Sequence, residues 1–287
     1  MKTIALFNPK SGSVPPDARD RLAAVLQEVG HGGAEMVEVD TSDPDAQLRE
    51  LAKQSPDLFI VWGGDGTLRC ALTTIGEVTP NLLLLPGGTM NLLPNVLHGQ
   101  KPWDEVLRAV IKSPRRHTLP AGEVNGQRFY CAMLAGAPAK FAEARESLRR
   151  GDLGKAAAEA GVALDTLNNL HLHARFANGY AFGNERLPTT SVIGAVIGPL
   201  TRAGSGMEVA ALTNPTTGAA LNVLWSSFFS DWRNAPDVQV AQATSLEIAG
   251  EDDEEIPVIA DGEATEPASR VRVTFIENGG QCLVAAS

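Results

Sequence analysis

The sequence LFIVW at Leu58–Trp62 runs directly into the glycine-rich sequence GGDGT at Gly63–Thr67. Five consecutive apolar residues predict a strand that is buried on both faces, as strands of parallel sheets are. The helical pattern of Thr67–Ile75 follows at once and completes a strand–turn–helix unit. Glycines in such a turn permit positive φ and let backbone N–H groups approach an anionic ligand.

Short apolar runs and helical patterns alternate on both sides of this unit, which predicts an α/β domain with a parallel sheet over residues 1–113. Strands are expected at Lys2–Phe7, Ala34–Asp40, Leu58–Trp62 and Asn81–Leu85, and helices at Asp17–Val29, Asp43–Lys53, Thr67–Ile75 and Trp103–Lys112.

Residues 114–287 follow a different pattern, in which β-rich segments are separated by Gly, Asn and Pro turns. This pattern predicts a β-sandwich domain with a helical insert near residues 139–167. The expected strands are Arg128–Leu134, Ser191–Ile197, Gly206–Leu212, Val238–Ile248 and Arg270–Ile276.

Two further loops each follow a predicted strand of the first domain, NPKSG at Asn8–Gly12 and PGGTMN at Pro86–Asn91. The carboxyl ends of parallel strands share one edge of a sheet, so the three loops are expected to lie together. Their glycines and the helices that begin after them predict a cradle for a polyphosphate. The alternative is that the glycines only make tight turns. The standard P-loop and dinucleotide-binding signatures are absent, so a nucleotide site here is of another kind.

Taken together, the three loops resemble the ATP-binding motifs of the diacylglycerol kinase catalytic-domain family, which includes bacterial lipid kinases, sphingosine kinases and ceramide kinases. Asp261-Gly262-Glu263 resembles the D-G-E turn of that family. The resemblance implies an N-terminal nucleotide-binding domain, a C-terminal β-sandwich that binds the lipid, and an active site in the cleft. It also implies ATP and Mg²⁺ as cofactors.

The resemblance implies a set of nucleotide contacts in the first domain. They are Asn8, Pro9, Lys10, Ser11, Gly12, Thr41, Gly63, Gly64, Asp65, Gly66, Thr67, Gly88, Thr89 and Asn91. Thr41 has an alternative role as the N-cap of the next helix. Asp65 is an acid within an anion-binding loop, and we expect it to help hold the Mg²⁺–ATP unit.

Asp261 and Glu263 are the expected catalytic residues. At i and i+2 of an extended turn their side chains would lie on the same side. By resemblance Glu263 accepts the proton of the acceptor hydroxyl, and Asp261 orients it or serves as the base. The alternative is that Asp-Gly-Glu is merely a type I′ hairpin turn.

Two segments bear on the acceptor. Leu134–Ala139 stands where the family has a G-x-G-x-D-A-like turn, and it contains no acid. Thr217–Val223 replaces an acidic segment that some bacterial members use for a structural Mg²⁺, so no second metal site is expected. An apolar cluster with helical spacing is either core or a membrane-touching lip; it comprises Leu224, Trp225, Phe228, Phe229 and Trp232.

The predicted function is therefore transfer of a phosphoryl group from ATP to a membrane lipid, diacylglycerol first and ceramide or a sphingoid lipid second. Two alternatives remain open. One is an NAD kinase, because NAD kinases carry a similar glycine-glycine-aspartate loop. The other is a non-catalytic lipid- or nucleotide-binding protein of the same fold, which the altered Leu134–Ala139 turn favours.

The composition limits the partners. A formal net charge of −10 disfavours a broad nucleic-acid-binding face. Three widely separated cysteines are typical of a reducing cytoplasm, and no uncharged apolar stretch is long enough to span a bilayer. We therefore expect a cytoplasmic protein that is peripheral at the inner membrane surface and makes transient contact with it. The sequence leaves a homodimer open.

Overall fold

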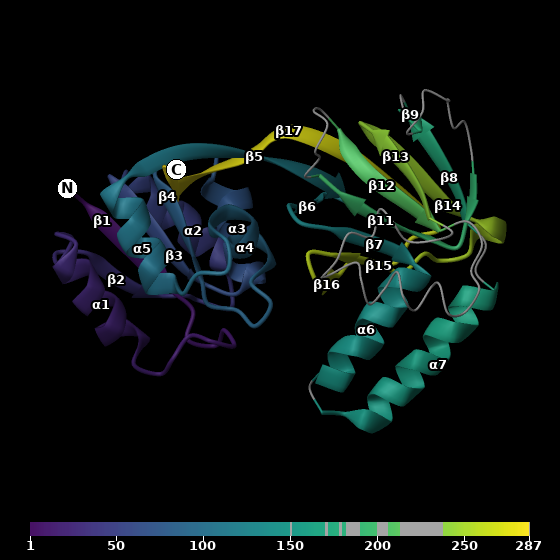
Figure 1. The fold of residues 1–287 in the computed structure, drawn as a ribbon, viewed down its shortest axis with the longest axis horizontal. Coiled ribbons are helices and arrows are strands. Elements are labelled where there is room, and N and C mark those ends of the chain that lie inside the picture. Colours follow the sequence, from purple (N-terminus) through teal and green to yellow (C-terminus); the bar gives the residue numbers. More distant parts are fainter. Residues whose placement is uncertain are drawn as a thin grey trace. The chain divides into compact units, whose positions relative to one another are not determined.

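The computed structural model describes residues 1–149, 151–169, 172–177, 180–181, 190–199, 206–212 and 238–286. The chain forms two compact units. The first consists of Met1–Ala121 and Asn278–Ser287, and the second of Gly122–Glu277. Strand β5 (Pro114–Val124) leads from the first unit to the second, and β17 (Arg270–Ala285) leads back (Figure 1). The predicted strand Arg270–Ile276 is only the first part of β17, and the rest of β17 carries the chain back to the first unit.

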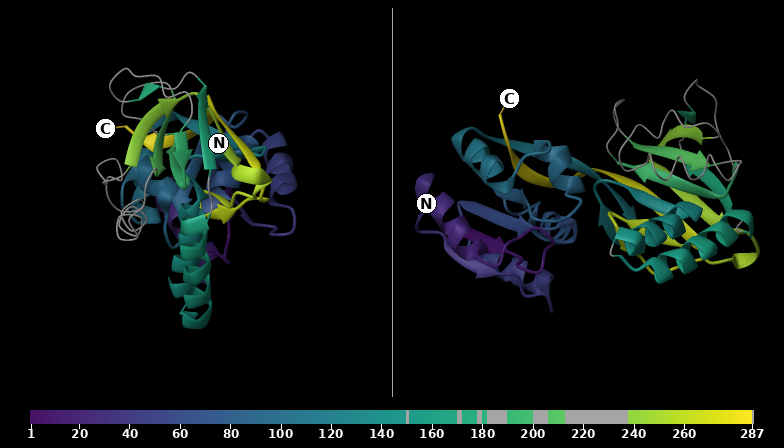
Figure 2. Two further views of the ribbon diagram at one scale, coloured as in Figure 1. Left: turned by 90° about the vertical axis from the view of Figure 1, so that its right-hand side faces the viewer. Right: turned by 60° about the horizontal axis from the view of Figure 1, so that its bottom comes forward.

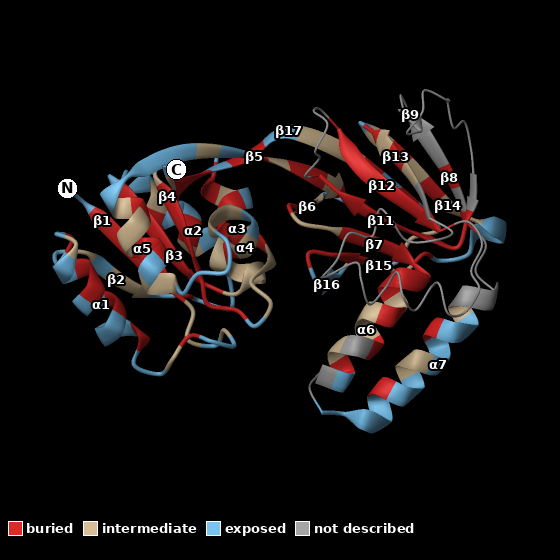
Figure 3. Cartoon of the chain, viewed as in Figure 1, coloured by how far each residue is buried: buried red, intermediate tan, exposed pale blue. Residues whose placement is uncertain are grey.

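The first unit contains the predicted parallel sheet, in the order β2-β1-β3-β4. Its strands are β1 (Thr3–Phe7), β2 (Glu35–Glu38), β3 (Leu58–Gly63) and β4 (Leu82–Pro86). Every residue of β1, β3 and β4 is buried (Figure 3). The continuous apolar runs in the sequence therefore correspond to strands covered on both faces, as expected.

Five helices accompany this sheet, namely α1 (Ala18–Glu28), α2 (Pro44–Lys53), α3 (Asp65–Ile75), α4 (Leu92–His98) and α5 (Trp103–Lys112). Helices α1 and α5 share one core with alternate strand residues such as Ala5, Ile60 and Leu83. Leu283 of β17 belongs to the same core, which explains why the end of the chain packs on this unit.

The second unit is a β-sandwich of two mainly antiparallel sheets, as predicted. The six-stranded sheet has the order β10-β8-β14-β17-β5-β6, and the seven-stranded sheet has the order β16-β15-β7-β11-β12-β13-β9. One core cluster joins residues of both sheets, for example Leu246 and Val271 with Ala195 and Val209. The remaining strands are β6 (Gln127–Phe129), β7 (Met133–Gly136), β8 (Leu172–Ala177), β9 (Tyr180–Ala181), β10 (Thr190–Val192), β11 (Gly194–Gly198), β12 (Met207–Leu212), β13 (Val238–Ala243), β14 (Ser245–Gly250), β15 (Val258–Ala260) and β16 (Glu263–Ala264), with a short 3-10 helix at Glu251–Asp253.

Two segments that were each predicted as one strand are divided. Arg128–Leu134 forms the end of β6 and the start of β7, and the chain leaves the ladder at Tyr130–Ala132. Val238–Ile248 forms β13 of one sheet and β14 of the other, with Thr244 between them. In both places the chain passes between the two sheets of the sandwich, and an apolar run does not reveal such a crossing.

The helical insert is a hairpin of α6 (Ala137–Arg149) and α7 (Leu153–Asn169), whose helices lie side by side (Figure 2). Ala139 of α6 packs on Leu134, Val196, Ala210 and Ile259, on the outer face of the seven-stranded sheet. Within the described residues, no helix is long and apolar enough to cross a membrane. Thr217–Val223 and the apolar cluster Leu224–Trp232 lie outside the described residues.

Candidate functional site

The first two glycine-bearing loops are joined by side-chain hydrogen bonds. Asn8 Nδ2 donates to Thr67 Oγ1 at 2.9 Å, and the backbone N–H of Gly64 donates to Ser11 Oγ at 2.9 Å. Asn8 also accepts from the backbone N–H of Lys10 through Oδ1 at 3.0 Å, which fixes the turn around Pro9. The loops after β1 and β3 therefore form one surface at the carboxyl edge of the sheet, as predicted.

The third loop is attached to the first through Ser13, which the sequence analysis did not single out. The N–H of Ser13 donates to the carbonyl of Gly87 at 3.0 Å, and Ser13 Oγ donates to the carbonyl of Gly88 at 2.8 Å. Asn91 Oδ1 accepts from the N–H of Gly88 at 2.7 Å, so the third loop is also held internally. The only sequence signal for Ser13 is its place directly after the Asn8–Gly12 loop.

The loop glycines serve close packing, and they do not use the positive φ that glycine permits. None of Gly12, Gly64 and Gly88 is among the residues with positive φ. A Cβ on Gly88 would lie 2.9 Å from the Cα of Gly64, and one on Gly12 would lie 2.4 Å from Thr89 Oγ1. The second and third loops approach backbone to backbone, and Gly12 of the first loop lies against the Thr89 side chain. Glycine provides this closeness. At Asn91, which precedes α4, the backbone does adopt positive φ, at 50°.

Helix α3 begins at Asp65, two residues earlier than predicted, with Gly64 at the N-cap. Gly66 and Thr67 therefore lie in its first turn. The N–H groups of a first helical turn have no acceptor within the helix, and the helix dipole adds positive potential there. The free N–H groups and the positive potential at the start of α3 suit a phosphate group. Glycine is also required at Gly63, at the end of β3, because a Cβ there would lie 2.8 Å from Thr67 Cβ.

Asp65 connects the second loop to the third. Its Oδ1 accepts from the N–H of Leu93 at 3.0 Å, and the N–H groups of Asn91 and Leu92 also stabilise the carboxylate. Burial nevertheless raises the pKa of Asp65, because desolvation outweighs these hydrogen bonds. The carboxylate thus caps the N-terminus of α4, and its incompletely compensated charge fits a nearby cation.

A divalent ion at this edge would need oxygens from its substrate. In the part of the chain that the structure describes, no three His, Cys, Asp or Glu side chains gather closely enough to hold a metal ion. One carboxylate with phosphate oxygens is a usual environment for Mg²⁺. Asp65 therefore fits a shared protein–nucleotide site and does not fit a metal site made by the protein alone.

Two substitutions at Asp65 separate its capping role from its role toward a cation. Asp65→Ala should lower the free energy of unfolding by about 1 kcal/mol, because the cap of α4 is lost. Asp65→Asn retains an acceptor oxygen and removes the buried charge, so thermal unfolding should be nearly unchanged. If Asp65 binds Mg²⁺, only the magnesium concentration needed for nucleotide binding should rise in Asp65→Asn. An unchanged magnesium requirement would assign Asp65 to capping alone.

Lys10 and Thr41 lie together at the same edge. Lys10 Nζ donates to Thr41 Oγ1 at 3.0 Å. The alternative that Thr41 caps the next helix is wrong, since the N-cap of α2 is Asp43, whose carboxylate accepts from the N–H of Ala46. The ammonium group of Lys10 is thereby held beside the first loop, where it can neutralise phosphate charge.

Asp261 and Gly262 connect β15 to β16 and both have positive φ, 47° and 86°. Two such residues between paired strands form a type I′ hairpin, so the alternative interpretation of this turn is correct as geometry. The turn also does more than reverse the chain. Asp261 is 8% exposed, and its carboxylate accepts from the N–H groups of Tyr130 at 2.7 Å, Cys131 at 2.8 Å and Ala132 at 3.0 Å.

Glu263 begins β16 and is exposed, whereas Asp261 is buried. The expectation that both side chains lie on the same side of an extended turn is therefore wrong, because positive φ at two successive residues replaces the extended backbone that would align i with i+2. The two acids therefore differ in burial and in role. Asp261 is an anchor for the Tyr130–Ala132 segment, and Glu263 is the acid that solvent reaches.

A second buried acid of this unit was not predicted. Glu208 of β12 is 1% exposed and pairs in register with Gly198 of β11. It lies on the same face of β12 as Ala210, which packs in the cluster that contains Ala139 of α6. The altered segment Leu134–Ala139 is itself buried throughout, with Pro138 filling the space above Gly194. The sequence signal that could have indicated Glu208 is an acidic residue within an otherwise apolar predicted strand.

Residues 2–120 match the sequence model of the diacylglycerol kinase catalytic domain. This match confirms the resemblance inferred from the three loops, and it supports a lipid-kinase type of function with a nucleotide substrate. It covers the N-terminal segment of the first unit, including most of β5; the Asn278–Ser287 segment of that unit and the Asp261-Gly262-Glu263 turn lie beyond the match.

Solved structures from Bacillus anthracis str. Sterne share the fold of the whole chain. One is described as a diacylglycerol kinase; it is 18% identical, has a TM-score of 0.70, and is aligned over 99% of this chain and 96% of its own. Two others, provisionally so described, are each 17% identical. Their TM-scores are 0.70 and 0.65, over 99% and 98% of this chain and 95% and 96% of theirs.

Proposed function

We propose that this protein is an ATP- and Mg²⁺-dependent lipid kinase that works at the inner surface of the membrane. The acceptor is a free hydroxyl of a membrane lipid, diacylglycerol first and ceramide or a sphingoid lipid second. One observation carries the proposal: three loops are bonded to one another at the carboxyl edge of a parallel sheet, within the segment that matches a kinase family.

On the donor side, the first unit supplies positive potential and small residues. The N–H groups that begin α3 and the ammonium of Lys10 face the same edge of the sheet, where a triphosphate is held in our proposal. Gly12, Gly64 and Gly88 add no side chain of their own where the loops approach one another. A bound Mg²⁺ would be held by Asp65 and phosphate oxygens and would neutralise their charge.

On the acceptor side, Glu263 is the proposed proton acceptor. As the hydroxyl oxygen of the lipid forms its bond to the γ-phosphorus, its proton passes to the Glu263 carboxylate. The bond from the γ-phosphorus to the bridging oxygen breaks, and its electron pair leaves with ADP. Asp261 contributes indirectly, because its three backbone hydrogen bonds fix the turn that presents Glu263.

A non-catalytic binding protein is the second candidate, and the buried, acid-free Leu134–Ala139 segment favours it. An NAD kinase is the third. It is disfavoured by the PGGTMN loop at Pro86–Asn91 and by the family match over residues 2–120.

One experiment separates the three functions. The purified protein is incubated with γ-labelled ATP and Mg²⁺ in mixed micelles of diacylglycerol, ceramide, sphingosine or monoacylglycerol, with NAD in a lipid-free tube. Label in a lipid supports the proposal and names the acceptor. Label only in NAD assigns the protein to the NAD kinases. Binding of ATP without label in any acceptor contradicts a kinase and supports the binding protein.

A further inference from the structure

Two buried side-chain oxygens have no hydrogen-bond partner within the residues that the structure describes, Thr265 Oγ1 and Glu159 Oε2. Nearly all buried polar atoms of folded proteins are paired, because an unpaired atom loses its bonds to water and gains none in return. An exception therefore indicates an internal water or a ligand. The two oxygens differ in their surroundings, and only that of Thr265 lies near a residue of the proposed reaction.

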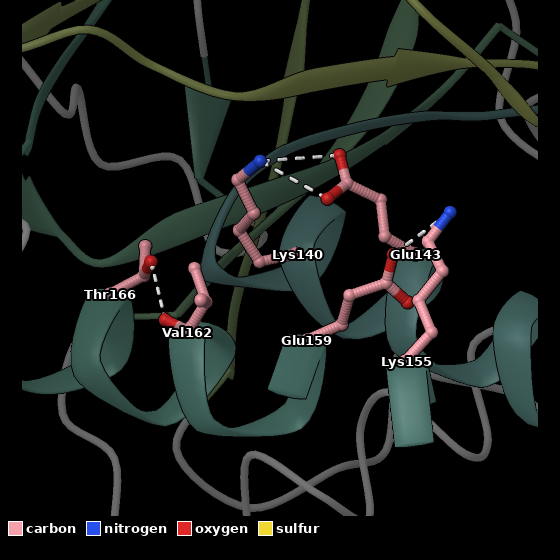
Figure 4. Close-up of polar contacts among 6 residues, drawn as sticks. All are labelled: Lys140, Glu143, Lys155, Glu159, Val162 and Thr166. Atoms are coloured by element: carbon pink, nitrogen blue, oxygen red, sulfur yellow. Dashed lines mark hydrogen bonds and ion pairs between the residues drawn. The ribbon is translucent and has the colours of Figure 1, made fainter. Parts of the chain in front are cut away.

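The carboxylate of Glu159 has a partner for its charge. Its other oxygen, Oε1, lies 3.7 Å from Lys155 Nζ, one turn earlier in α7 (Figure 4). An ion pair between residues i and i+4 of one helix is a common stabilising contact, so Glu159 requires no ligand. Thr265 has a single side-chain oxygen, and no described residue pairs with it.

The backbone of Thr265 is held on both sides. Its N–H donates to the carbonyl of Val258 at 3.0 Å, which continues the β15–β16 pairing one residue beyond β16. The carbonyl of the next residue, Glu266, accepts from Asn125 Nδ2 at 3.4 Å. The unpaired hydroxyl is therefore carried by a hydrogen-bonded segment, and a lack of local structure does not explain it.

Thr265 and Glu263 lie on the same face of the β15–β16 hairpin. Directly opposite residues of paired antiparallel strands point to the same side, and successive residues alternate. Glu263 pairs in register with Ala260. Thr265 lies opposite Val258 through the bond just described, and both Ala260 and Val258 belong to the core between the two sheets. The proposed proton acceptor and the unpaired hydroxyl are thus neighbours on one face, roughly 7 Å apart along the strand.

The hydroxyl of Thr265 can turn toward a ligand without losing a hydrogen bond. The hydroxyl and the methyl group of threonine are both carried on Cβ, so a rotation about χ1 moves the hydroxyl to another of the three positions. Oγ1 is now enclosed and unpaired, while the residue as a whole is half-buried. A ligand that supplies an acceptor atom therefore has no internal partner to compete with.

We propose that Thr265 positions the lipid acceptor by donating a hydrogen bond from its hydroxyl to an ester carbonyl of diacylglycerol. The nearer ester is attached to the carbon next to the one that carries the free hydroxyl, so one headgroup can meet Thr265 and Glu263 together. An ester carbonyl only accepts, and a threonine hydroxyl can donate. The inference rests on the proposed function, because it adds a contact to the acceptor site around Glu263, but it concerns binding alone.

The test compares the isosteric variant Thr265→Val with wild type. Removal of the unpaired hydroxyl should raise the melting temperature of the full chain by about 2–4 °C, because an unsatisfied polar group leaves the interior. The same change should raise the dissociation constant of dihexanoylglycerol, measured by thermal shift, about fivefold, because one hydrogen bond to the ester is lost. A gain in stability together with a loss of affinity distinguishes a ligand contact from a structural role.

Thr166→Val is the matched control, because the Thr166 hydroxyl has a partner, the carbonyl of Val162 at 2.8 Å (Figure 4). It should not raise the melting temperature, and its affinity for dihexanoylglycerol should equal that of wild type. Thr265→Ser retains the hydroxyl and should retain the affinity. The ether analogue dihexylglycerol lacks the carbonyl, so wild type and Thr265→Val should bind it equally.

The inference is overturned if dihexanoylglycerol does not shift the melting temperature of wild type, or if Thr265→Val binds it as tightly as wild type does. It is also overturned if Thr265→Val loses stability, because the hydroxyl then has an internal partner. An equal loss of affinity for the ester and the ether would overturn it as well, because the carbonyl would then play no part.

Phosphoryl transfer separates this inference from the proposed function. Ligand binding that depends on Thr265, without transfer to any lipid, would leave the inference standing and contradict the kinase. Transfer with the same KM for diacylglycerol in wild type and Thr265→Val would support the kinase and contradict the inference. A raised KM for diacylglycerol, with unchanged turnover and unchanged KM for ATP, would support both.

Discussion

Glu263→Gln is expected to lower the turnover of lipid phosphorylation by about 10²–10⁴-fold, the usual contribution of a positioned general base. The amide retains the size of the side chain but cannot accept a proton at neutral pH. Glu263 is exposed at the start of β16, so the free energy of unfolding should change by less than about 0.5 kcal/mol. Turnover and KM for both substrates are measured with γ-labelled ATP and the lipid that the acceptor panel identifies.

Glu266→Gln is the matched control, because it makes the same chemical change at an exposed position three residues further along the chain. Its turnover should equal that of wild type. A loss confined to turnover in Glu263→Gln, with unchanged KM for ATP, identifies a group that acts in the transition state. Full turnover in this variant would mean that another group accepts the proton, and the assignment of Glu263 would be wrong.

The parallel sheet of the first unit could be predicted nearly completely because its signals are local, whereas the return of Asn278–Ser287 to this unit was not predicted. The apolar run Leu58–Trp62 specifies a strand covered on both faces, and the turn after it specifies the carboxyl edge. The position of the loops at one edge follows from parallel strands alone. The hydrogen bonds that join them do not follow, because Ser13 reaches Gly87 and Gly88, residues far along the chain.

The reason for the glycines could not be predicted either. A sequence shows that Gly64 and Gly88 lack side chains, but not whether backbone conformation or a neighbour requires this. Here a neighbouring residue requires glycine, since a Cβ on either residue would approach the Cα of the other. The same holds for Asp65, whose acidic character suggested a metal site. That its carboxylate also caps α4 depends on the position of Leu93 in the first turn of α4, directly after the third loop.

The sequence predicted the fold class of the second unit but not the ends of its strands, because these strands pair with partners that are distant in sequence. The segment Arg128–Leu134 has the composition of one strand, yet Tyr130–Ala132 donates its N–H groups to Asp261. A carboxylate that takes three donors removes them from the ladder, and no local pattern records this. The Asp-Gly-Glu motif thus predicted the position of an important turn. The orientation expected for the Asp261 side chain was wrong.

Asp261→Asn is therefore expected to destabilise the second unit by about 3 kcal/mol, since hydrogen bonds to a buried charged group are each worth about 1.5–3 kcal/mol. Asn has one acceptor oxygen, which can still face Cys131 and Ala132, but its amide group would then meet the N–H of Tyr130. Thermal unfolding and hydrogen exchange of the Tyr130, Cys131 and Ala132 amides measure the effect, and these three amides should exchange faster.

Asp252→Asn is the control for Asp261→Asn, because Asp252 also has positive φ, 51°, but is exposed. It should leave unfolding and exchange unchanged, which separates the buried carboxylate from the backbone conformation that both residues share. Activity should fall in Asp261→Asn together with stability, in contrast to Glu263→Gln. If activity fell while exchange and unfolding stayed as in wild type, Asp261 would act on the substrate itself and the division between anchor and base would be reversed.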